Sequence, residues 1–125
     1  MNSLGELQRE WLQRRAFQAA PEEACGFLLA DGKFVEIRNS HPYPYKAFCM
    51  SELDLNSKIK NPNDIKAIWH THPSGSLEPS GADMDFMFSS GVNWSYIIAT
   101  KSDIRIWAPN SFTPQDDSFW KAFSQ

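Results

Sequence analysis

Apolar residues near the amino terminus recur at the spacing of an amphipathic helix. They are Leu4, Leu7, Trp11, Leu12 and Phe17, with Glu and Arg residues between them. The pattern predicts a helix over residues 3–20. Ser3 and Glu6 have the spacing of an amino-terminal capping box, and Pro21 prevents the helix from continuing.

Apolar runs further along the chain have the length and composition of strands. We expect strands over residues 23–30, 33–38, 65–72, 94–100 and 104–108, and a short one over 47–50. Asp31-Gly32 predicts a two-residue hairpin turn between the first two strands. In the strand 65–72, alternation places Ile65, Ala67 and Trp69 on one face and Lys66, Ile68, His70 and His72 on the other.

The remaining segments predict three more helices and the connecting loops. The helices cover residues 53–59, 80–89 and 114–123; the middle one has an apolar stripe of Met84, Met87 and Phe88, with Gly91 as its stop signal. The segments 39–45 and 61–64 contain prolines and predict a loop and a turn. Together these elements predict an α/β fold, a mixed β-sheet with flanking helices, in a single domain over residues 1–125.

Composition restricts the partners that the domain can have. The chain has 125 residues, is 42% hydrophobic and carries a formal net charge of -3. The chain is therefore long and apolar enough to form a hydrophobic core. Its negative net charge gives no reason to expect nucleic acid or an anionic membrane as a partner. A peptide or protein is the expected partner. No apolar run long enough to cross a bilayer and no signal peptide are present, which predicts a soluble, cytoplasmic protein.

The two cysteines, Cys25 and Cys49, form no CxxC pair and no disulfide framework. Each has apolar neighbours, so both are expected to be buried, reduced thiols. A rival interpretation makes Cys25 a nucleophile that uses one of the histidines, and it requires histidines that hold no metal.

The candidate chemistry is concentrated between Trp69 and Asp83. His70 and His72 are two positions apart, so a strand projects both imidazoles from the same face, as two ligands of one small ion require. An ordinary pair of surface or core histidines has the same spacing. Ser80 and Asp83 have the spacing of a helix cap and its third residue, and Asp83 can both cap the helix and complete a three-ligand zinc site.

A hydrolase also needs a group that moves a proton. Glu22 and Glu23 stand at the start of the first strand, and composition alone does not choose between them or exclude that both are solvated. Ser80 can donate its hydroxyl to a developing oxyanion, but its role as a helix cap explains the spacing equally well.

Together these residues resemble the JAB/MPN domain with the JAMM zinc metallopeptidase motif. In that motif a Glu precedes His-Ser/Thr-His-Pro, which is followed by Pro-Ser and then Asp. The chain has the pattern in full as Glu23, His70-Thr71-His72-Pro73, Pro79-Ser80 and Asp83. The Glu of the family commonly stands just before a Cys-Gly pair, and this register selects Glu23 over Glu22.

The resemblance implies a fold, a metal and a set of roles. The implied fold is similar to that of the cytidine deaminases, and the implied cofactor is Zn²⁺ held by His70, His72 and Asp83. Glu23 is implied as the general acid/base, and Ser80 as the group that steadies the tetrahedral intermediate. The implied activity is hydrolysis of a peptide or isopeptide bond. The motifs of the zinc deaminases and of the HExxH metalloproteases are absent from the sequence.

Within the family, the chain is most similar to the compact bacterial and phage branch, which includes tail-assembly protein K of lambdoid phages. The similarity lies in residues 23–27, Arg38-Asn39 and 94–98. It predicts a role in phage tail assembly, with tail proteins as partners and association with the virion. The alternatives are a non-catalytic structural or interaction module of a phage tail, and processing of the C-terminus of a sulfur-carrier protein.

The irregular segment 43–63 is predicted to form the specificity wall of the substrate site. It is expected to lie near the metal, and Phe48 and Met50 are its candidate contact residues.

Overall fold

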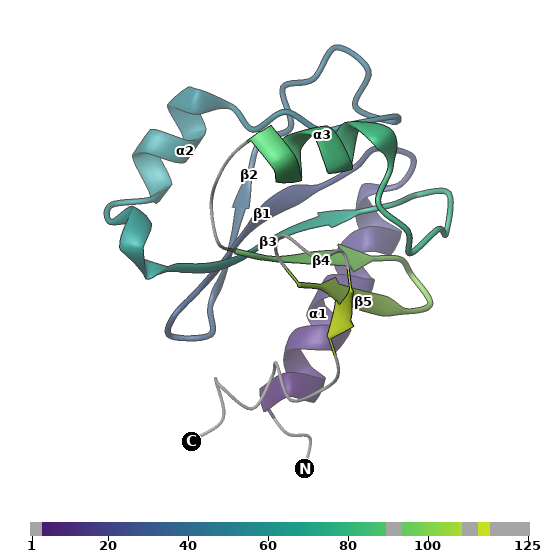
Figure 1. Ribbon diagram of the computed structural model, residues 1–125, viewed down its shortest axis with the longest axis horizontal. Helices are drawn as coiled ribbons and strands as arrows, with labels where there is room; N and C mark the ends of the chain where they lie inside the picture. The colour runs from purple at the N-terminus through teal and green to yellow at the C-terminus, as the bar shows by residue number, and fades with distance from the viewer. Residues whose placement is uncertain (1–3, 90–93, 109–112, 116–125) are drawn as a thin grey trace.

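The fold is a six-stranded mixed sheet with helices packed against it (Figure 1). The computed structural model describes residues 4–89, 94–108 and 113–115. In chain order the elements are α1 (Leu4–Ala19), β1 (Cys25–Leu29), β2 (Phe34–Ile37), α2 (Glu52–Lys58), the 3₁₀ helix η1 (Pro62–Asp64), β3 (Ile65–Thr71), α3 (Gly81–Ser89), β4 (Ser95–Ala99), β5 (Ile104–Trp107) and β6 (Pro114–Gln115). The predicted α/β fold, with a mixed sheet and flanking helices, is confirmed.

The strand order is β2-β1-β3-β4-β5-β6. β1 runs antiparallel to both of its neighbours, while β3 and β4 are parallel. A parallel pair needs a crossover connection, and the segment that contains α3 supplies it. The end of β3 therefore leads directly into the loop and helix that carry the second half of the motif.

Helix α1 covers one face of the sheet, as Figure 1 shows. Leu12 and Ala16 are buried, and Leu12 packs in one cluster with Leu28, Ala67 and Trp69. Trp11 stacks on Phe34. Leu7 and Phe17 were predicted on the apolar face, but their side chains are 51% and 68% exposed. The face that meets the sheet is instead rotated toward Gln8, whose side chain is buried and donates a hydrogen bond to the Gly32 carbonyl.

The opposite face of the sheet has its own apolar cluster. Phe27, Ile37, Ile68, Ile98 and Trp107 are buried there, and Phe48, Met50 and Leu55 pack against them from the connecting segment and α2. Alternation along β3 places His70 on this face beside Ile68, as predicted. Ile65 was predicted on the face of Ala67, but it joins the Ile68 cluster, because the register of β1 and β3 shifts between Leu28 and Leu29.

The first hairpin turns through three residues rather than two. Leu29 and Lys33 form the last hydrogen-bonded pair, so Ala30, Asp31 and Gly32 connect them. Gly32 has a φ of 88°, the left-handed conformation that closes a three-residue hairpin. The return strand accordingly begins at Phe34.

The predicted strand over residues 47–50 is wrong. Only an isolated bridge joins Asn39 to Met50, because the Cys49 amide donates its hydrogen bond to the side chain of Asn39. Cys25 is buried as predicted, whereas Cys49 is exposed.

Two further predictions about the second half of the chain fail. Met84 was assigned to an apolar stripe, but it is 39% exposed. Pro114 and Gln115 were predicted to open a helix, but they form β6, paired with Trp107 and Ile106 of β5. The predictions for Ser3, for Gly91 and for residues 116–123 lie outside the described residues, as do those for the side chains of Met87 and Phe88.

In the described part of the chain, no helix combines the length and the apolar character that crossing a bilayer requires.

The packing of β1 between its neighbours leaves no room for a side chain at Gly26. A Cβ there would collide with the Val35 carbonyl and would lie 2.9 Å from both Glu36 Cα and a ring atom of Trp69. We therefore expect Gly26→Ala to lower the free energy of unfolding by about 2–3 kcal/mol or to prevent folding, since backbone cannot move aside cheaply. Chemical denaturation measures this. Gly81→Ala is the matched control, because nothing lies within 4 Å of its Cβ position, and it should change stability by less than about 1 kcal/mol. Equal stability of the two variants would contradict this account of the sheet.

Candidate metal centre

Three side chains converge at the carboxyl end of β3. His70 Nε2 and His72 Nε2 are 3.0 Å apart, and each is 3.1 Å from Asp83 Oδ2. All three residues are buried. The structure thus brings together the two histidines and the aspartate that the sequence predicts as ligands.

Different local contacts hold each of the three residues in place. His70 lies within β3 and stacks against Phe48, with ring centroids 4.7 Å apart. His72 follows the strand, and its amide donates to the Ala99 carbonyl of β4. Asp83 belongs to a capping box at the start of α3: its amide donates to Ser80 Oγ at 3.1 Å, and its Oδ2 accepts from the Ser80 amide at 2.8 Å.

The loop between the strand and α3 is anchored from both sides. His72 Nδ1 is 2.9 Å from the Ser76 carbonyl, and Trp107 Nε1 donates to the Leu77 carbonyl. Arg105 on β5 forms an ion pair with Glu78. These contacts fix the path from His72 to α3, so that Asp83 faces the end of the strand.

The tautomer of His72 leaves one of its ring nitrogens able to bind a cation. The Ser76 carbonyl can only accept, so Nδ1 of His72 carries the proton and Nε2 of a neutral His72 presents a lone pair. This lone pair faces Asp83 Oδ2 and His70 Nε2 at 3.0–3.1 Å. In a tetrahedral zinc site with bonds of about 2.0–2.1 Å, ligand atoms stand about 3.3–3.4 Å apart. The observed triangle therefore fits a small ion.

Charge and burial shift the pKa values of the three side chains in different directions. Burial lowers the pKa of His70, which favours the neutral form that coordinates metals. Burial alone would raise the pKa of Asp83, but hydrogen bonds to His70 and His72 outweigh it and hold that pKa well below its usual range. For His72, burial acts to lower the pKa, and the interaction with Asp83 raises it overall.

Glu23 lies next to this triangle. It precedes β1, is buried, and offers a carboxylate oxygen within 4.8 Å of ligand atoms of both histidines. Burial raises its pKa to about 7. Its Oε1 is buried and has no hydrogen-bond partner among the described residues. A buried carboxyl group without a partner is costly, so a position of this kind indicates a function in chemistry or ligand binding.

Two overlapping triplets can therefore hold an ion: Glu23 with the two histidines, or Asp83 with them. We favour Asp83 as the third ligand, because its oxygen stands as close to both rings as they do to each other. Glu23 stands further out. It is better placed to contact a molecule on the ion than the ion itself.

A cleft of about 340 Å³ opens onto Glu23, His72 and Ser80. Tyr45 and Lys46 form its other wall. The predicted specificity segment thus reaches the site through these two residues. Phe48 lies behind the histidines and Met50 lies in the apolar cluster, so neither of these candidate contact residues lines the cleft.

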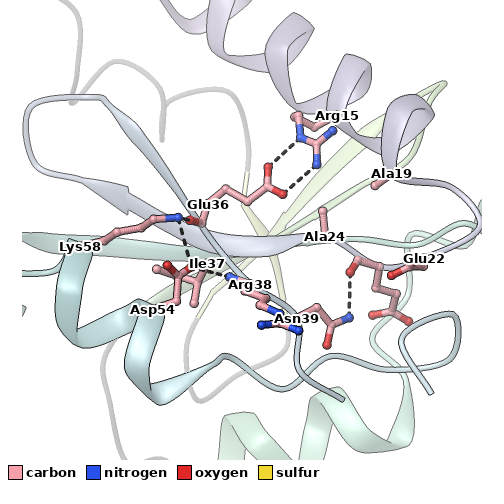
Figure 2. A pocket seen from close by; sticks show the side chains of 11 residues that line it. Arg15, Ala19, Glu22, Ala24, Glu36, Ile37, Arg38, Asn39, Asp54 and Lys58 are labelled. Carbon is pink, nitrogen blue, oxygen red and sulfur yellow. Dashed lines mark hydrogen bonds and ion pairs between the residues drawn. The ribbon is translucent and has the colours of Figure 1, made fainter. Parts of the chain in front are cut away.

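A larger cavity of about 620 Å³ lies between α1, β2 and α2 and also reaches Glu23 (Figure 2). Arg15 and Glu36 form a bidentate ion pair within it. The outer edge of β2 is capped here by α2, because Lys58 donates to the Glu36 carbonyl and Asp54 accepts from the Arg38 amide. An extended peptide therefore cannot add to these groups of β2 unless their bonds to α2 break.

Sequence reasoning did not assign a role to Thr71. Its hydroxyl accepts from the Ala24 amide at 2.9 Å, and its own amide donates to the Ala24 carbonyl. Thr71 thus fastens the segment that carries Glu23 to the histidine strand. The alternative role for Cys25 as a nucleophile is not supported, because burial raises its pKa to about 12 and its thiol donates to the Ile37 carbonyl.

Comparison with protein families matches residues 8–110 to the prokaryotic homologs of the JAB domain. The chain belongs to this family. The match spans α1 through β5 and includes every residue of the cluster.

The fold also matches a solved structure, a structural-genomics target from Desulfitobacterium hafniense determined in solution. The two are 21% identical, with a TM-score of 0.66, and the match covers 89% of this chain and 87% of the other. This likeness concerns the JAB-domain fold alone. A comparison with curated proteins finds no significant match.

The geometry predicts that metal binding depends on two of the three histidines in the chain. We expect His72→Ala to lose most bound zinc, since two ligands seldom retain an ion that needs three. His41→Ala is the matched control, because His41 lies outside the cluster and its Nδ1 accepts from the Tyr43 amide. Elemental analysis of the purified, zinc-loaded proteins measures the content per chain. Wild-type zinc content in His72→Ala would show that this cluster is not the metal site.

Proposed function

We propose that the protein is a zinc-dependent metallopeptidase that hydrolyses a peptide or isopeptide bond. The observation that carries the proposal is the triangle of His70, His72 and Asp83 beside Glu23, whose buried Oε1 has no partner among the described residues. Membership in the JAB family and the full set of motif residues support the same function. In this proposal His70, His72 and Asp83 hold Zn²⁺.

Bound zinc would supply Lewis acidity toward a carbonyl oxygen and would lower the pKa of a water molecule toward neutrality. The protein must then move protons and stabilise charge. Three donor atoms that lie 3.0–3.1 Å from one another would occupy one side of a bound ion and leave its other side open. The cleft beside His72 gives a substrate access to the remaining side.

Glu23 is proposed to be the proton carrier. A carboxyl group with a pKa of about 7 can accept a proton from the attacking water and return it to the leaving amine at neutral pH. Its buried Oε1 has no partner among the described residues that would compete for that proton.

Ser80 is proposed to stabilise the developing oxyanion. Its Oγ accepts from the Asp83 amide, which leaves the hydroxyl proton free to donate into the cleft that the residue lines. The helix cap and the oxyanion donor are thus two uses of one hydroxyl group, one through its lone pair and one through its proton.

The substrate is proposed to be a peptide or protein that lies between Tyr45–Lys46 and the loop 73–80. A role in phage tail assembly, or in processing a sulfur-carrier protein, stays a prediction from the sequence. A chain that binds no zinc and cleaves nothing would favour the non-catalytic module instead.

We expect Glu23→Gln to keep zinc and to lose about 10²–10⁴-fold in turnover, because an amide cannot accept the proton. The assay uses a library of internally quenched peptides and then its best substrate. Glu22→Gln is the matched control, since Glu22 is the exposed neighbour, and it should cleave like the wild type. If Glu23→Gln cleaves normally, Glu23 is not the proton carrier.

We expect Ser80→Ala to have two separable effects. Loss of the cap should cost about 0.5–2 kcal/mol of stability, and loss of the oxyanion donor should lower turnover by about 10²–10³-fold. Ser51→Ala is the matched control, because Ser51 caps α2 in the same way by accepting from the Asp54 amide. Denaturation and peptide cleavage measure the two effects. A Ser80→Ala enzyme that is destabilised but fully active would reduce Ser80 to a helix cap.

A further inference from the structure

Asn39 uses its whole side-chain amide to organise the backbone around Glu23. Its Nδ2 donates to the Glu23 carbonyl at 2.8 Å and to the Ala47 carbonyl at 3.1 Å. Its Oδ1 accepts from the amides of His41 and Cys49, both at 3.0 Å. Figure 2 shows the side chain reaching from the end of β2 toward the segment before β1.

These partners leave a single orientation for the amide group. Carbonyl oxygens can only accept, and backbone amides can only donate, so exchanging Oδ1 and Nδ2 would break all four contacts. The side chain is half-buried, and two protons and two lone pairs are all in use. Neither an aliphatic residue nor a carboxylate can make the same set of bonds.

The backbone of Glu23 is held on this side by a second contact. Its amide donates to the Pro44 carbonyl at 2.7 Å. The neighbouring residue, Ala24, is bonded through both its amide and its carbonyl to Thr71 of the histidine strand. The segment Glu23–Ala24 is therefore clamped between β3 on one side and the loop organised by Asn39 on the other.

The same loop forms the far wall of the cleft. Asn39 bonds to its beginning at His41 and to its end at Ala47 and Cys49. Between these anchors, Tyr43 and Tyr45 are more than half exposed, and Tyr45 lines the cleft together with Lys46. One side chain thus connects the position of Glu23 to the position of the wall that faces it.

We infer that Asn39 is a positioning residue that sets both the Glu23 carboxylate and the Tyr43–Ala47 wall of the cleft. The inference rests on the proposed function for its kinetic consequence, but its structural consequence does not depend on activity. Asn39 contacts none of the three proposed ligands, so zinc binding should not need it.

The first test is amide hydrogen exchange, which needs no substrate. In Asn39→Ala the Cys49 amide, which donates to Asn39, should exchange about tenfold faster or more, which corresponds to the loss of one hydrogen bond. The Glu23 amide donates to the Pro44 carbonyl, and it should also exchange faster because Pro44 lies in the loop that Asn39 anchors. The Thr71 amide, which donates to Ala24 on the opposite side, should keep its wild-type rate. Unchanged exchange at Glu23 and Cys49 would overturn the inference.

Asn39→Asp separates the two halves of the role. A carboxylate can still accept from His41 and Cys49, but it cannot donate to Glu23 or Ala47. The Cys49 amide should therefore stay protected. The Glu23 amide should exchange faster, because losing the bonds to Glu23 and Ala47 loosens the loop that holds its acceptor, the Pro44 carbonyl. This variant also carries the test if Asn39→Ala does not fold, and equal protection of both amides in it would count against the inference.

The second test is kinetic and uses the best peptide from the quenched library. A misplaced general base should lower kcat by roughly 10²-fold in both variants at wild-type zinc content. KM should rise more in Asn39→Ala, which loses the bonds to His41 and Cys49 on either side of the wall as well as the bond to Ala47. Asn61→Ala is the matched control, because the Asn61 side chain only caps η1 by accepting from the Asn63 amide. Loss of zinc in parallel with kcat would overturn the assignment.

If the wild type cleaves no peptide, the proposed peptidase function fails, while exchange at Glu23 and Cys49 still decides whether Asn39 positions this segment. If the wild type is active and both Asn39 variants retain its kcat, the positioning role fails and the peptidase function stands.

Discussion

The antiparallel pairing of β1 with β3 is the constraint on which the site depends. It continues beyond Cys25 through the bonds between Ala24 and Thr71, which are 47 positions apart in the chain. Without it, Glu23 and the histidines would belong to unrelated segments. Gly26 makes this pairing possible, because a side chain there would collide with the neighbouring strand β2 and with Trp69. The chemistry is thus placed by packing at a residue that takes no part in it.

The crossover from β3 to β4 positions Asp83, the proposed third ligand, in a different way. Strand geometry aims the histidines, whereas a helix terminus aims Asp83. The loop between them is tied to β5 through Trp107 and Arg105. The end of β3 and the start of α3 therefore hold the three candidate donor atoms 3.0–3.1 Å from one another.

The parts of this architecture that follow local rules were predictable from the sequence. Period-two alternation placed His70 on the face of Ile68, and the capping spacing of Ser80 and Asp83 located the start of α3. What failed depends on distant partners. The segment 47–50 is predicted as a strand, but the Cys49 amide donates to the side chain of Asn39. Pro114 is predicted to open a helix, but it pairs with Trp107 of β5. Neither partner is visible in a local pattern.

The importance of Asn39 was hidden from sequence analysis for the same reason. An asparagine after a strand predicts a loop, because its side chain commonly accepts a hydrogen bond from the backbone two residues further on. One of its bonds, to His41, is of this ordinary kind. The other three join Asn39 to the backbone of Ala47, Cys49 and Glu23, which are eight, ten and sixteen residues away in the chain. A residue that only closes a turn would need the first bond alone, whereas the remaining three tie the two ends of the loop to the segment that carries Glu23.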